Sequence, residues 1–256
     1  MTKTIKNWKK WVSETFFDYQ GIDIEHFVNR VEGPRNKTVI HIPARSGSTR
    51  VEDKNIKELC GIPLLAYTIA VAKSLPVDRV IVNTDSKEYA RIAEMYGAEV
   101  PFLRPSALSG DDVAPGLATY YAERFLLSEG YALETVIDMY PTSLFRNVEK
   151  IKTYIEKVHT AGHCVTGFMP DLDFKHIYTR RDRVQIDNEQ VHGGKDTFFK
   201  LTANFVGRKL LSSQKRWFQY ELINNPIELI DIDTPEDFAL AECIVENDLY
   251  DFGVMI

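Results

Sequence analysis

Cysteine is scarce in this sequence, and its placement argues against the sites that cysteine usually builds. Cys60, Cys164 and Cys243 lie far apart, are odd in number and lack metal-ligand spacing. Neither a zinc site nor a disulfide framework fits this pattern. We therefore expect buried thiols in a reducing compartment.

The sequence also lacks an excess of positive charge and any long apolar run. Its formal net charge is −6, which argues against a nucleic-acid partner, because nucleic-acid binders usually carry a basic face. No stretch approaches the about 18 consecutive apolar residues of a membrane-spanning helix. The N-terminus "MTKTIKNWKKWVSETFF" has no apolar core followed by a cleavage site. These absences predict a cytoplasmic protein without a membrane partner.

From residue 38 onward the sequence contains short apolar runs that alternate with helical periods. Runs of this kind, separated by helices, predict βαβ units and a mainly parallel sheet flanked by helices, which is an α/β fold. The expected strands cover residues 38–44, 79–85 and 134–143, and the expected helices cover 62–75, 86–97, 114–130 and 147–162.

Two regions depart from this alternation. Residues 4 to about 31 have helix-like spacing, so residues 1–37 are expected to form an appended helical extension and linker before a domain over residues 38–256. Its aromatic residues are expected to pack against the same protein; they are Trp8, Trp11, Phe16 and Phe17. Residues 163–227 contain two apparent strands, "HCVTGFMP" and "RVQIDN", in a charged and irregular insert. This insert is expected to carry substrate contacts or a dimer arm.

The loop after the first expected strand combines small and basic residues. Ligands of open parallel sheets bind at the carboxyl ends of strands, and this loop lies at such an end. Its small residues allow backbone N–H groups to approach phosphate, and its cations neutralise phosphate charge; the residues concerned are Pro43, Ala44, Arg45, Ser46, Gly47, Ser48, Arg50 and Lys54. It is neither a Walker loop nor a G-x-G-x-x-G turn. A triphosphate cradle and a solvated basic loop fit the spacing equally well.

Four stretches resemble the successive motifs of the acylneuraminate cytidylyltransferase family. They are "IPARSGSTRVEDKNIKELCGIPLLAYTI", "VIVNTDSKEYARIAEMYGAEVPFLRP", "YPTSLFR" and "ELIDIDTPEDFALAE". The resemblance covers most of residues 38–150 and 228–242, and the motifs occur in the family's order. It implies a nucleotide-diphospho-sugar transferase-like, Rossmann-like sheet. It also implies an enzyme that transfers CMP from CTP to the anomeric hydroxyl of a nonulosonic acid and releases pyrophosphate.

The resemblance also assigns the nucleotide contacts to Arg45, Lys54, Asn55 and Arg104, with Thr84 beside the first loop. Each has an ordinary alternative. Lys54 and Asn55 could merely start the next helix, and Arg104 could be a loop charge. Asp85, which follows Thr84, is expected to cap the helix that begins near Ser86.

Asp231 and Asp233 form the clearest chemical signal outside the loop. On an expected strand with period-2 alternation they point to one face, while Ile230 and Ile232 enter the core. Adjacent carboxylates repel unless a cation joins them, and Mg²⁺ suits such a site because it takes few carboxylates and bridges to phosphate. The alternative is that Asp233 caps the next helix. The matching aspartates of the family bind the catalytic metal, so we favour Mg²⁺ at this pair.

The departures from the family pattern concern the acceptor. Where the family commonly has Q-P-T-S-P-L-R, this chain has Tyr140 for the glutamine and Leu144 for the second proline, and near R-P-N-G it has Thr202 for the arginine. Lys175 resembles a family lysine that meets the sugar carboxylate. The resemblance thus implies acceptor contacts from Tyr140, Thr142, Ser143, Lys175 and Asn204.

Three functions remain open on the sequence. The preferred one is a homodimeric nonulosonic acid cytidylyltransferase that uses CTP and a small anionic sugar acid. The second is a cytidylyltransferase for another anionic acceptor, such as a different ulosonic acid or a phosphonate. The third is a non-catalytic nucleotide- or sugar-binding homologue, which the altered Tyr140 and Thr202 positions leave open.

Overall fold

A computed structural model describes residues 27–110, 113–168, 177–180, 183–186, 189–194, 197–210 and 217–256. The predicted helical extension lies outside these residues except for its end. Residues 27–31 are not helical, so the prediction is wrong there. The aromatic stripe from Trp8 to Phe17 and Lys175 also lie outside the described residues.

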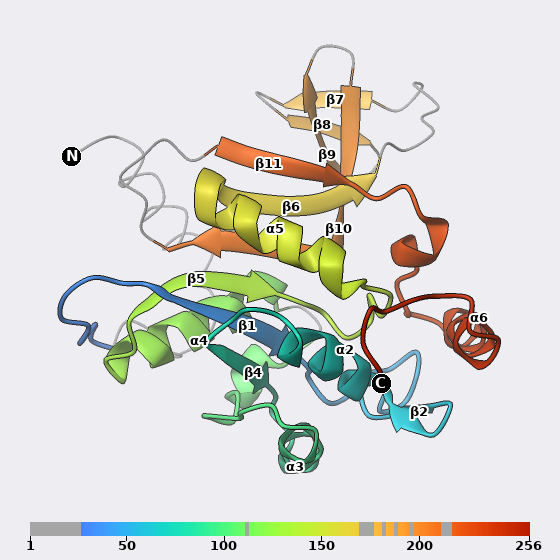
Figure 1. Ribbon diagram of the computed structural model, residues 1–256, viewed down its shortest axis with the longest axis horizontal. Coiled ribbons are helices and arrows are strands. Elements are labelled where there is room, and N and C mark those ends of the chain that lie inside the picture. The colour runs from blue at the N-terminus through green and yellow to red at the C-terminus, as the bar shows by residue number, and fades with distance from the viewer. Residues whose placement is uncertain are drawn as a thin grey trace.

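Three parallel strands form one half of the sheet. They are β1 (Lys37–Pro43), β4 (Arg79–Asn83) and β5 (Leu133–Asp138), in the order β4-β1-β5, with β4 at the edge of the sheet (Figure 1). Both faces of these strands are covered, which explains why their sequences are nearly continuous apolar runs. The three predicted strands and the α/β class are confirmed.

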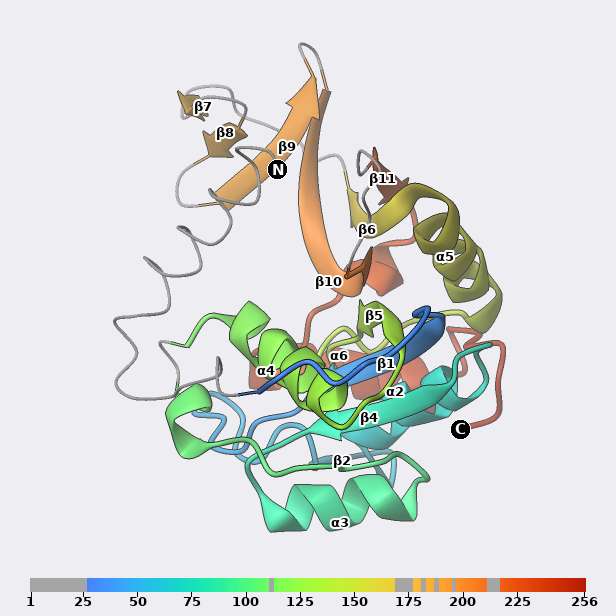
Figure 2. The ribbon, with the colours of Figure 1, turned by 90° about the vertical axis from the view of Figure 1, so that its left-hand side faces the viewer.

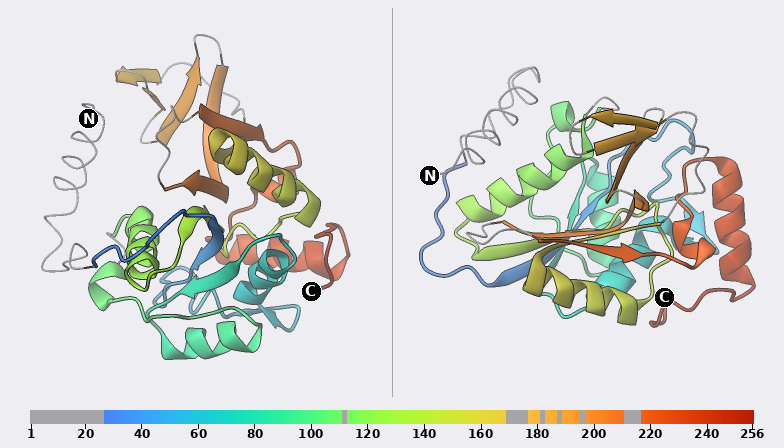
Figure 3. Two further views of the ribbon diagram at one scale, coloured as in Figure 1. Left: turned by 60° about the vertical axis from the view of Figure 1, so that its left-hand side comes forward. Right: turned by 90° about the horizontal axis from the view of Figure 1, so that it is seen from above.

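Helices cover the two faces of this parallel half (Figure 3). Ile40 and Ile42 pack with residues of α2 (Leu64–Lys73) and α5 (Val148–Ala161), whereas Val39 packs with residues of α4 (Pro115–Ser128) on the opposite face. The fourth predicted helix is α3 (Lys87–Met95). Alternate residues of β1 therefore face different helical layers, as the pleat of a strand requires.

The insert after α5 is β-structure rather than irregular chain. Two of its strands, β6 (Gly162–Phe168) and β8 (Arg183–Ile186), match the predicted ones. The others were missed because their sequences lack a clear period-2 alternation; they are β7 (Ile177–Arg180), β9 (Glu189–Gly194), β10 (Thr197–Lys209) and β11 (Trp217–Leu222).

Strand β10 joins the strands of the insert to the parallel half of the sheet. It runs antiparallel to β5, β6 and β9, while β11 pairs in parallel with β6. Strand β9 pairs with the first residues of β10, and β8 and β7 follow it in the sheet, away from the helices (Figure 2). The sheet thus continues from a parallel half into an antiparallel half.

The last part of the chain crosses the carboxyl edge of the parallel strands. A short 3₁₀-helix, η4 (Pro226–Leu229), precedes residues 230–233 and helix α6 (Pro235–Glu246). The predicted strand over residues 228–233 is wrong, because the segment has no ladder partner. Ile232 N instead donates to Thr142 O at 2.9 Å, in the loop after β5. Among the described residues, no helix is long and apolar enough to cross a bilayer.

Candidate active site

The loops that follow β1 and β4 are tied together by Asp85. Ser46 donates to the Asp85 carboxylate through its backbone N–H at 2.8 Å and through its hydroxyl at 2.9 Å. The predicted helix-capping role of Asp85 is therefore wrong, because Ser86 caps α3 by accepting from Tyr89 N. Asp85 fixes the course of the first loop instead. Its bond to Ser46 also occupies one of the N–H groups that the sequence offered to phosphate.

The rest of the first loop suits close approach by a ligand. Gly47 has a φ of 73°, in the left-handed region that favours glycine, and a Cβ there would meet no atom within 4 Å. Ala44 is completely buried at the end of β1, and its N–H donates to Asn83 O at 3.0 Å. Pro43 is the last residue of β1, and Ser48 is half-buried on the loop.

Lys54 and Asn55 are buried within a turn. The alternative prediction, that they merely start the next helix, is therefore wrong. Lys54 Nζ lies 2.8 Å from Asp233 Oδ1. Asn55 Nδ2 donates to Arg45 O at 3.0 Å, whereas Asn55 Oδ1 is buried without a hydrogen-bond partner among the residues that the structure describes. A buried acceptor without a donor costs about 1–3 kcal/mol. A ligand that donates a hydrogen bond to Asn55 would remove this cost.

Arg104 is a buried cation rather than a loop charge on the surface. It is 6% exposed, and its Nε donates to Asn83 Oδ1 at 2.8 Å while Nη2 donates to Asn83 O. Burial lowers the pKa of Arg104 to about 10; nearby Asp85 raises the pKa and nearby Arg45 lowers it. In the described part of the chain no carboxylate forms an ion pair with it. Two guanidinium groups, one of them desolvated, therefore face the same region, which favours an anionic ligand.

Two other residues of this edge have partners within the protein. Thr84 is completely buried, and its Oγ1 accepts from Ser86 N at 3.2 Å. Arg45 is half-buried, with Nη1 3.4 Å from Ser109 O. The structure thus brings Arg45, Thr84 and Arg104 to the edge formed by the ends of β1 and β4.

Asp231 and Asp233 lie on the solvent side of residues 230–233. Asp231 is exposed, Ile232 is completely buried, and the side chain of Asp233 is 50% exposed. The expected alternation is therefore present without the expected strand. Asp233 does not cap α6, because Thr234 does so in a capping box with Asp237.

The donor set of this pair fits a hard divalent cation. Carboxylate oxygens are ligands that Mg²⁺ prefers, and Mg²⁺ usually takes one or two of them with water and phosphate. The Asp233 carboxylate contacts Lys54 and, at 3.3 Å, Arg50 Nη1. Both cations could turn to a triphosphate and leave the carboxylate to a metal ion.

The loop after β5 is held by a buried arginine. Arg146 is 1% exposed and donates to the backbone O of Asn204 at 2.5 Å and of Tyr140 at 2.7 Å. Burial lowers the pKa of Arg146 to about 9, and nearby Asp231 raises it. Arg146 therefore joins the predicted acceptor loop to β10.

The predicted acceptor residues have different surroundings. Tyr140 is half-buried; burial first, and then Asp138, raises the pKa of its phenol, while Arg104 and Arg208 lower it. Ser143 is buried, and its N–H donates to Tyr140 O at 3.2 Å.

The side chains of Asn204 and Thr202 form hydrogen bonds with other residues of the protein. Asn204 Nδ2 donates to Phe145 O at 3.0 Å and to Glu228 O at 3.3 Å. Thr202 Oγ1 lies 2.9 Å from Thr166 Oγ1. Both side chains therefore stabilise the junction of β10 with its neighbours.

The sequence analysis did not predict a cluster of buried polar side chains beneath this edge. It consists of His41, Asn83, Thr119 and Asp138. His41 interrupts an apolar strand, and Asp138 ends another. Because the two strands were expected to be parallel, their polar residues were a signal that could have been used.

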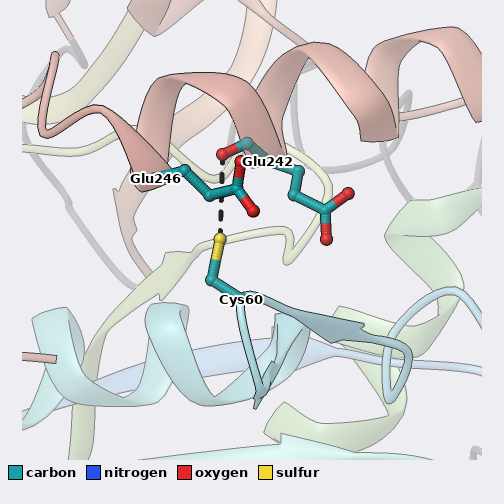
Figure 4. A group of neighbouring side chains, drawn as sticks. All are labelled: Cys60, Glu242 and Glu246. Atoms are coloured by element: carbon teal, nitrogen blue, oxygen red, sulfur yellow. Dashed lines mark hydrogen bonds between the residues drawn. The ribbon is translucent and has the colours of Figure 1, made fainter.

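Another cluster of potential metal ligands lies away from these residues. Cys60, Glu242 and Glu246 have ligand atoms within 4.8 Å of one another, and Cys60 Sγ points toward α6, 3.7 Å from Glu242 O (Figure 4). Burial first, and then Glu246 and Glu242, raises the pKa of the Cys60 thiol. A metal-binding thiol must lose its proton, so these three groups would bind a cation only with release of the Cys60 proton.

The three cysteines are free. Cys164 is buried as predicted, but Cys60 and Cys243 are exposed, which corrects the expectation of three buried thiols.

Comparison with known proteins identifies the family. The model of the family described as "Cytidylyltransferase" matches residues 39–256. CMP-N,N'-diacetyllegionaminic acid synthase of Legionella pneumophila is 31% identical over 221 residues, 80% of this chain and 94% of the relative. Pseudaminic acid cytidylyltransferase of Campylobacter jejuni is 25% identical over 81% of this chain and 96% of the relative. N-acylneuraminate cytidylyltransferase of Escherichia coli is 40% identical over 83% of this chain and 53% of the relative.

Solved structures agree on the fold. A CMP:2-keto-3-deoxy-manno-octonic acid synthetase complexed with CTP matches 83% of this chain and 100% of its own, with a TM-score of 0.58 and 13% identity. At this identity the likeness concerns the fold alone. Because the family model covers residues 39–256 and the Legionella relative is matched over nearly its whole length, this chain belongs to the cytidylyltransferase family.

Proposed function

We propose that this protein transfers CMP from CTP to the anomeric hydroxyl of a nonulosonic acid and releases pyrophosphate. The observation that carries the proposal is that the loop after β1 joins two charged pairs: Arg45 lies near the buried Arg104, and Lys54 pairs with Asp233. Asn55, next to Lys54, donates to Arg45 O and connects the two pairs. Its relatives act on legionaminic, pseudaminic and N-acylneuraminic acids according to their names, which supports this acceptor class.

The cations of the site would hold the triphosphate. Lys54 and Arg50 would exchange Asp233 for phosphate oxygens, and the desolvated Arg104 would gain the anion that it lacks within the described residues. Asn55 Oδ1 can only accept, so it would meet a ribose hydroxyl or the cytosine amino group rather than phosphate. Together these groups would orient CTP with its α-phosphorus open to the acceptor.

The reaction needs positioning and charge stabilisation. The anomeric oxygen forms a bond to the α-phosphorus, the bond from that phosphorus to the bridging oxygen breaks, and pyrophosphate leaves with the electron pair. The hydroxyl proton passes to solvent or to a basic group. Arg45, Lys54 and Arg104 would offset the negative charge on the phosphoryl oxygens.

Asp231 and Asp233 would hold Mg²⁺, the cofactor of this proposal. When bound, Mg²⁺ supplies positive charge to the triphosphate and acidity to the attacking hydroxyl. Asp233 lies beside Lys54, so this carboxylate and this cation would face the same phosphates.

The acceptor would lie over the loop after β5. Tyr140, Thr142 and Ser143 belong to this loop, and Lys175 would supply the cation for the acceptor carboxylate. The phenol of Tyr140 stands beside Asp138 and Arg104, so the acceptor would meet a hydroxyl donor where the family commonly has an amide.

The proposal extends to assembly and location. We propose a homodimer in which the β-rich insert over residues 163–227 provides the arm. We place the enzyme in the cytoplasm, which the three free cysteines support, because thiols persist in reducing compartments.

A pyrophosphate-release assay tests the reaction. Purified protein is incubated with CTP, MgCl₂ and a panel of acceptors: legionaminic, pseudaminic and N-acetylneuraminic acids, 3-deoxy-manno-octulosonic acid and a phosphonate. Release with one of the first three acids supports the proposal. Release only with the last two indicates the alternative acceptor class. No release with any acid, together with tight CTP binding, indicates a non-catalytic homologue.

A further inference from the structure

A histidine and an aspartate face each other inside the parallel sheet. His41 in β1 and Asp138 in β5 are register partners, and His41 Nδ1 lies 2.6 Å from Asp138 Oδ1. His41 is completely buried and Asp138 is 6% exposed. Thr119, in α4, donates its hydroxyl to the same carboxylate oxygen at 3.0 Å. The pair therefore lies between the sheet and α4, among apolar side chains.

Asn83 connects this pair to Arg104. Its Nδ2 lies 3.0 Å from His41 Nε2 and donates to Ala118 O at 2.8 Å, while its Oδ1 accepts from Arg104 Nε at 2.8 Å. Both the nitrogen and the oxygen of the Asn83 amide therefore form hydrogen bonds. Four side chains and one carbonyl form a continuous path from α4 to the guanidinium.

The partners fix the direction of every hydrogen bond along this path. An amide nitrogen only donates, so His41 Nε2 must accept and the ring proton must lie on Nδ1, toward Asp138. Arg104 Nε also only donates, so Asn83 must present its oxygen to Arg104. Reversing the Asn83 amide would place NH₂ opposite the Arg104 N–H, and the bond would be lost.

The cost of this arrangement indicates a role beyond packing. Replacing a buried ion pair by well-packed apolar residues of similar volume often leaves stability unchanged or raises it. Simple strand pairing between β1 and β5 requires neither a histidine nor an aspartate. The groups do satisfy one another, and the end of their path is a cation with no carboxylate partner in the described residues.

We propose that Thr119, Asp138, His41 and Asn83 are positioning residues that hold the Arg104 guanidinium in the geometry that binds the nucleotide. This inference rests on the proposed function for the identity of the ligand. His41 touches no ligand in this role. It acts through the Asn83 amide, which it keeps in the one orientation that Arg104 can use.

A double-mutant cycle tests whether His41 acts through Arg104. CTP affinity is measured by calorimetry, with MgCl₂, for wild type, His41→Leu, Arg104→Met and the double variant. His41→Leu is expected to weaken CTP binding about ten- to one-hundredfold. Without His41 the Asn83 amide is free to reverse, and Arg104 then loses its hydrogen bond from Nε, a bond to a charged group worth about this factor. In the Arg104→Met background the same change is expected to add nothing, because coupled residues are not additive.

Thr135→Val is the matched control. Thr135 is completely buried in the same strand as Asp138, and its hydroxyl has no hydrogen-bond partner. This variant is expected to keep the CTP affinity of wild type. Additive losses in the cycle, or an equal loss in Thr135→Val, would overturn the inference.

Nuclear magnetic resonance provides a test that does not require a stable His41 variant. In wild type, ring ¹⁵N shifts of His41 are expected to show the neutral Nδ1–H tautomer, and the Arg104 Nε–H is expected to exchange slowly with solvent. An Nε2–H tautomer or a rapidly exchanging Arg104 Nε–H would overturn the inference. In Asn83→Leu the Arg104 Nε–H is expected to lose its protection.

The outcomes separate this inference from the proposed function. CTP binding that follows the cycle, without pyrophosphate release for any acceptor, rejects the reaction and supports the positioning role. Normal turnover with unaltered CTP affinity in His41→Leu rejects the positioning role and supports the reaction. Absence of CTP binding in wild type rejects both.

Discussion

Lys54 and Asp233 are separated by 179 positions in the sequence, yet Lys54 Nζ lies 2.8 Å from Asp233 Oδ1. The lysine side chain is 10% exposed and the aspartate side chain 50% exposed, so the pair stands at the boundary between protein and solvent. A lysine in this position can pair with either a carboxylate or a phosphate. The ion pair therefore keeps both groups oriented before a ligand arrives.

Changing Asp233 to asparagine is expected to lower pyrophosphate release. The change nearly keeps the shape of the side chain but removes the charge that attracts Lys54 and Mg²⁺. Losing one such stabilising group typically costs about 10²–10³ in rate, and Asp231→Asn is expected to act in the same direction. The measurement is the initial rate of pyrophosphate release across a MgCl₂ titration.

Asp248→Asn is the control for the loss of one negative charge. Asp248 is exposed and has a φ of 52°, which asparagine adopts readily, so its rate is expected to equal that of wild type. Near-wild-type rates and unaltered Mg²⁺ dependence in both Asp231→Asn and Asp233→Asn would contradict the metal site.

Changing Arg45 to alanine is expected to weaken CTP binding without unfolding the protein. The residue is half-buried at the end of β1, and its charge lies near that of Arg104. Calorimetry measures the affinity, and thermal unfolding measures the fold. Arg91→Ala, on the exposed side of α3, removes the same charge away from the loop and is expected to bind CTP normally. Unchanged CTP affinity in Arg45→Ala would remove Arg45 from the nucleotide site.

Changing Lys175 to methionine is expected to raise the KM of the acceptor far more than that of CTP. This prediction comes from sequence alone, since Lys175 lies outside the described residues. The reason is that a fixed ammonium would pair with the acceptor carboxylate. Steady-state kinetics with each substrate varied in turn provide the measurement, and Lys152→Met on α5 is the control. Equal effects on both KM values would indicate a role in folding.

Changing Gly207 to alanine is expected to destabilise the fold. A Cβ at this position in β10 would collide with Val158 of α5 and lie 3.0 Å from the Phe205 ring. Overpacking of this kind costs about 1–3 kcal/mol in the free energy of unfolding, which denaturant titration measures. Gly116→Ala, where a Cβ would meet no atom within 4 Å, is expected to lose no stability. Equal stability of Gly207→Ala and wild type would show that α5 moves away from the sheet at little cost.

The capping carboxylate of α6 predicts a pH dependence of stability. Burial raises the pKa of Asp237, but hydrogen bonds from Asp233 N and from the N–H and hydroxyl of Thr234 outweigh it, so the pKa is lowered. A depressed pKa stabilises the folded state above the unfolded value of about 3.9. That contribution is lost as the pH falls through the folded value.

Denaturant titrations between about pH 3 and pH 6 measure this effect. Asp237→Asn is expected to unfold with a smaller dependence on pH than wild type, because asparagine does not titrate. Identical pH dependence of the two proteins would show that Asp237 contributes nothing to acid unfolding.

The sequence predicted those parts of the fold where local pattern and tertiary structure agree. The strand at 38–44 and the helix at 62–75 have clear apolar periods, and both are confirmed. The segment around Asp231 was wrong because alternation along a chain does not require a neighbouring strand. The strands of the insert were underestimated because strand pairing depends on distant residues and leaves little trace in the local pattern of one strand.

The loop residues of the candidate site were predicted from the sequence. The buried residues that support these loops were not. Arg45, Lys54 and Arg104 belong to motifs that can be recognised along the chain, and the structure brings them to one edge. His41 and Asp138 are 97 positions apart, and only the register of two parallel strands makes them neighbours. Such a pair becomes visible in a sequence only when strand order and register are known.

The ion pair of Lys54 and Asp233 also sets an order of events during synthesis. At about 5–20 residues per second, Asp233 is added roughly 9–36 seconds after Lys54. During this interval the basic loop has no acidic partner from the C-terminal segment. Docking of that segment is completed by Tyr250 and Phe252, whose rings pack on Phe145 at centroid distances of 5.2 and 5.9 Å. A chain released before residue 233 would therefore lack the carboxylate that pairs with Lys54 and the aromatic residues that hold the C-terminal segment on Phe145.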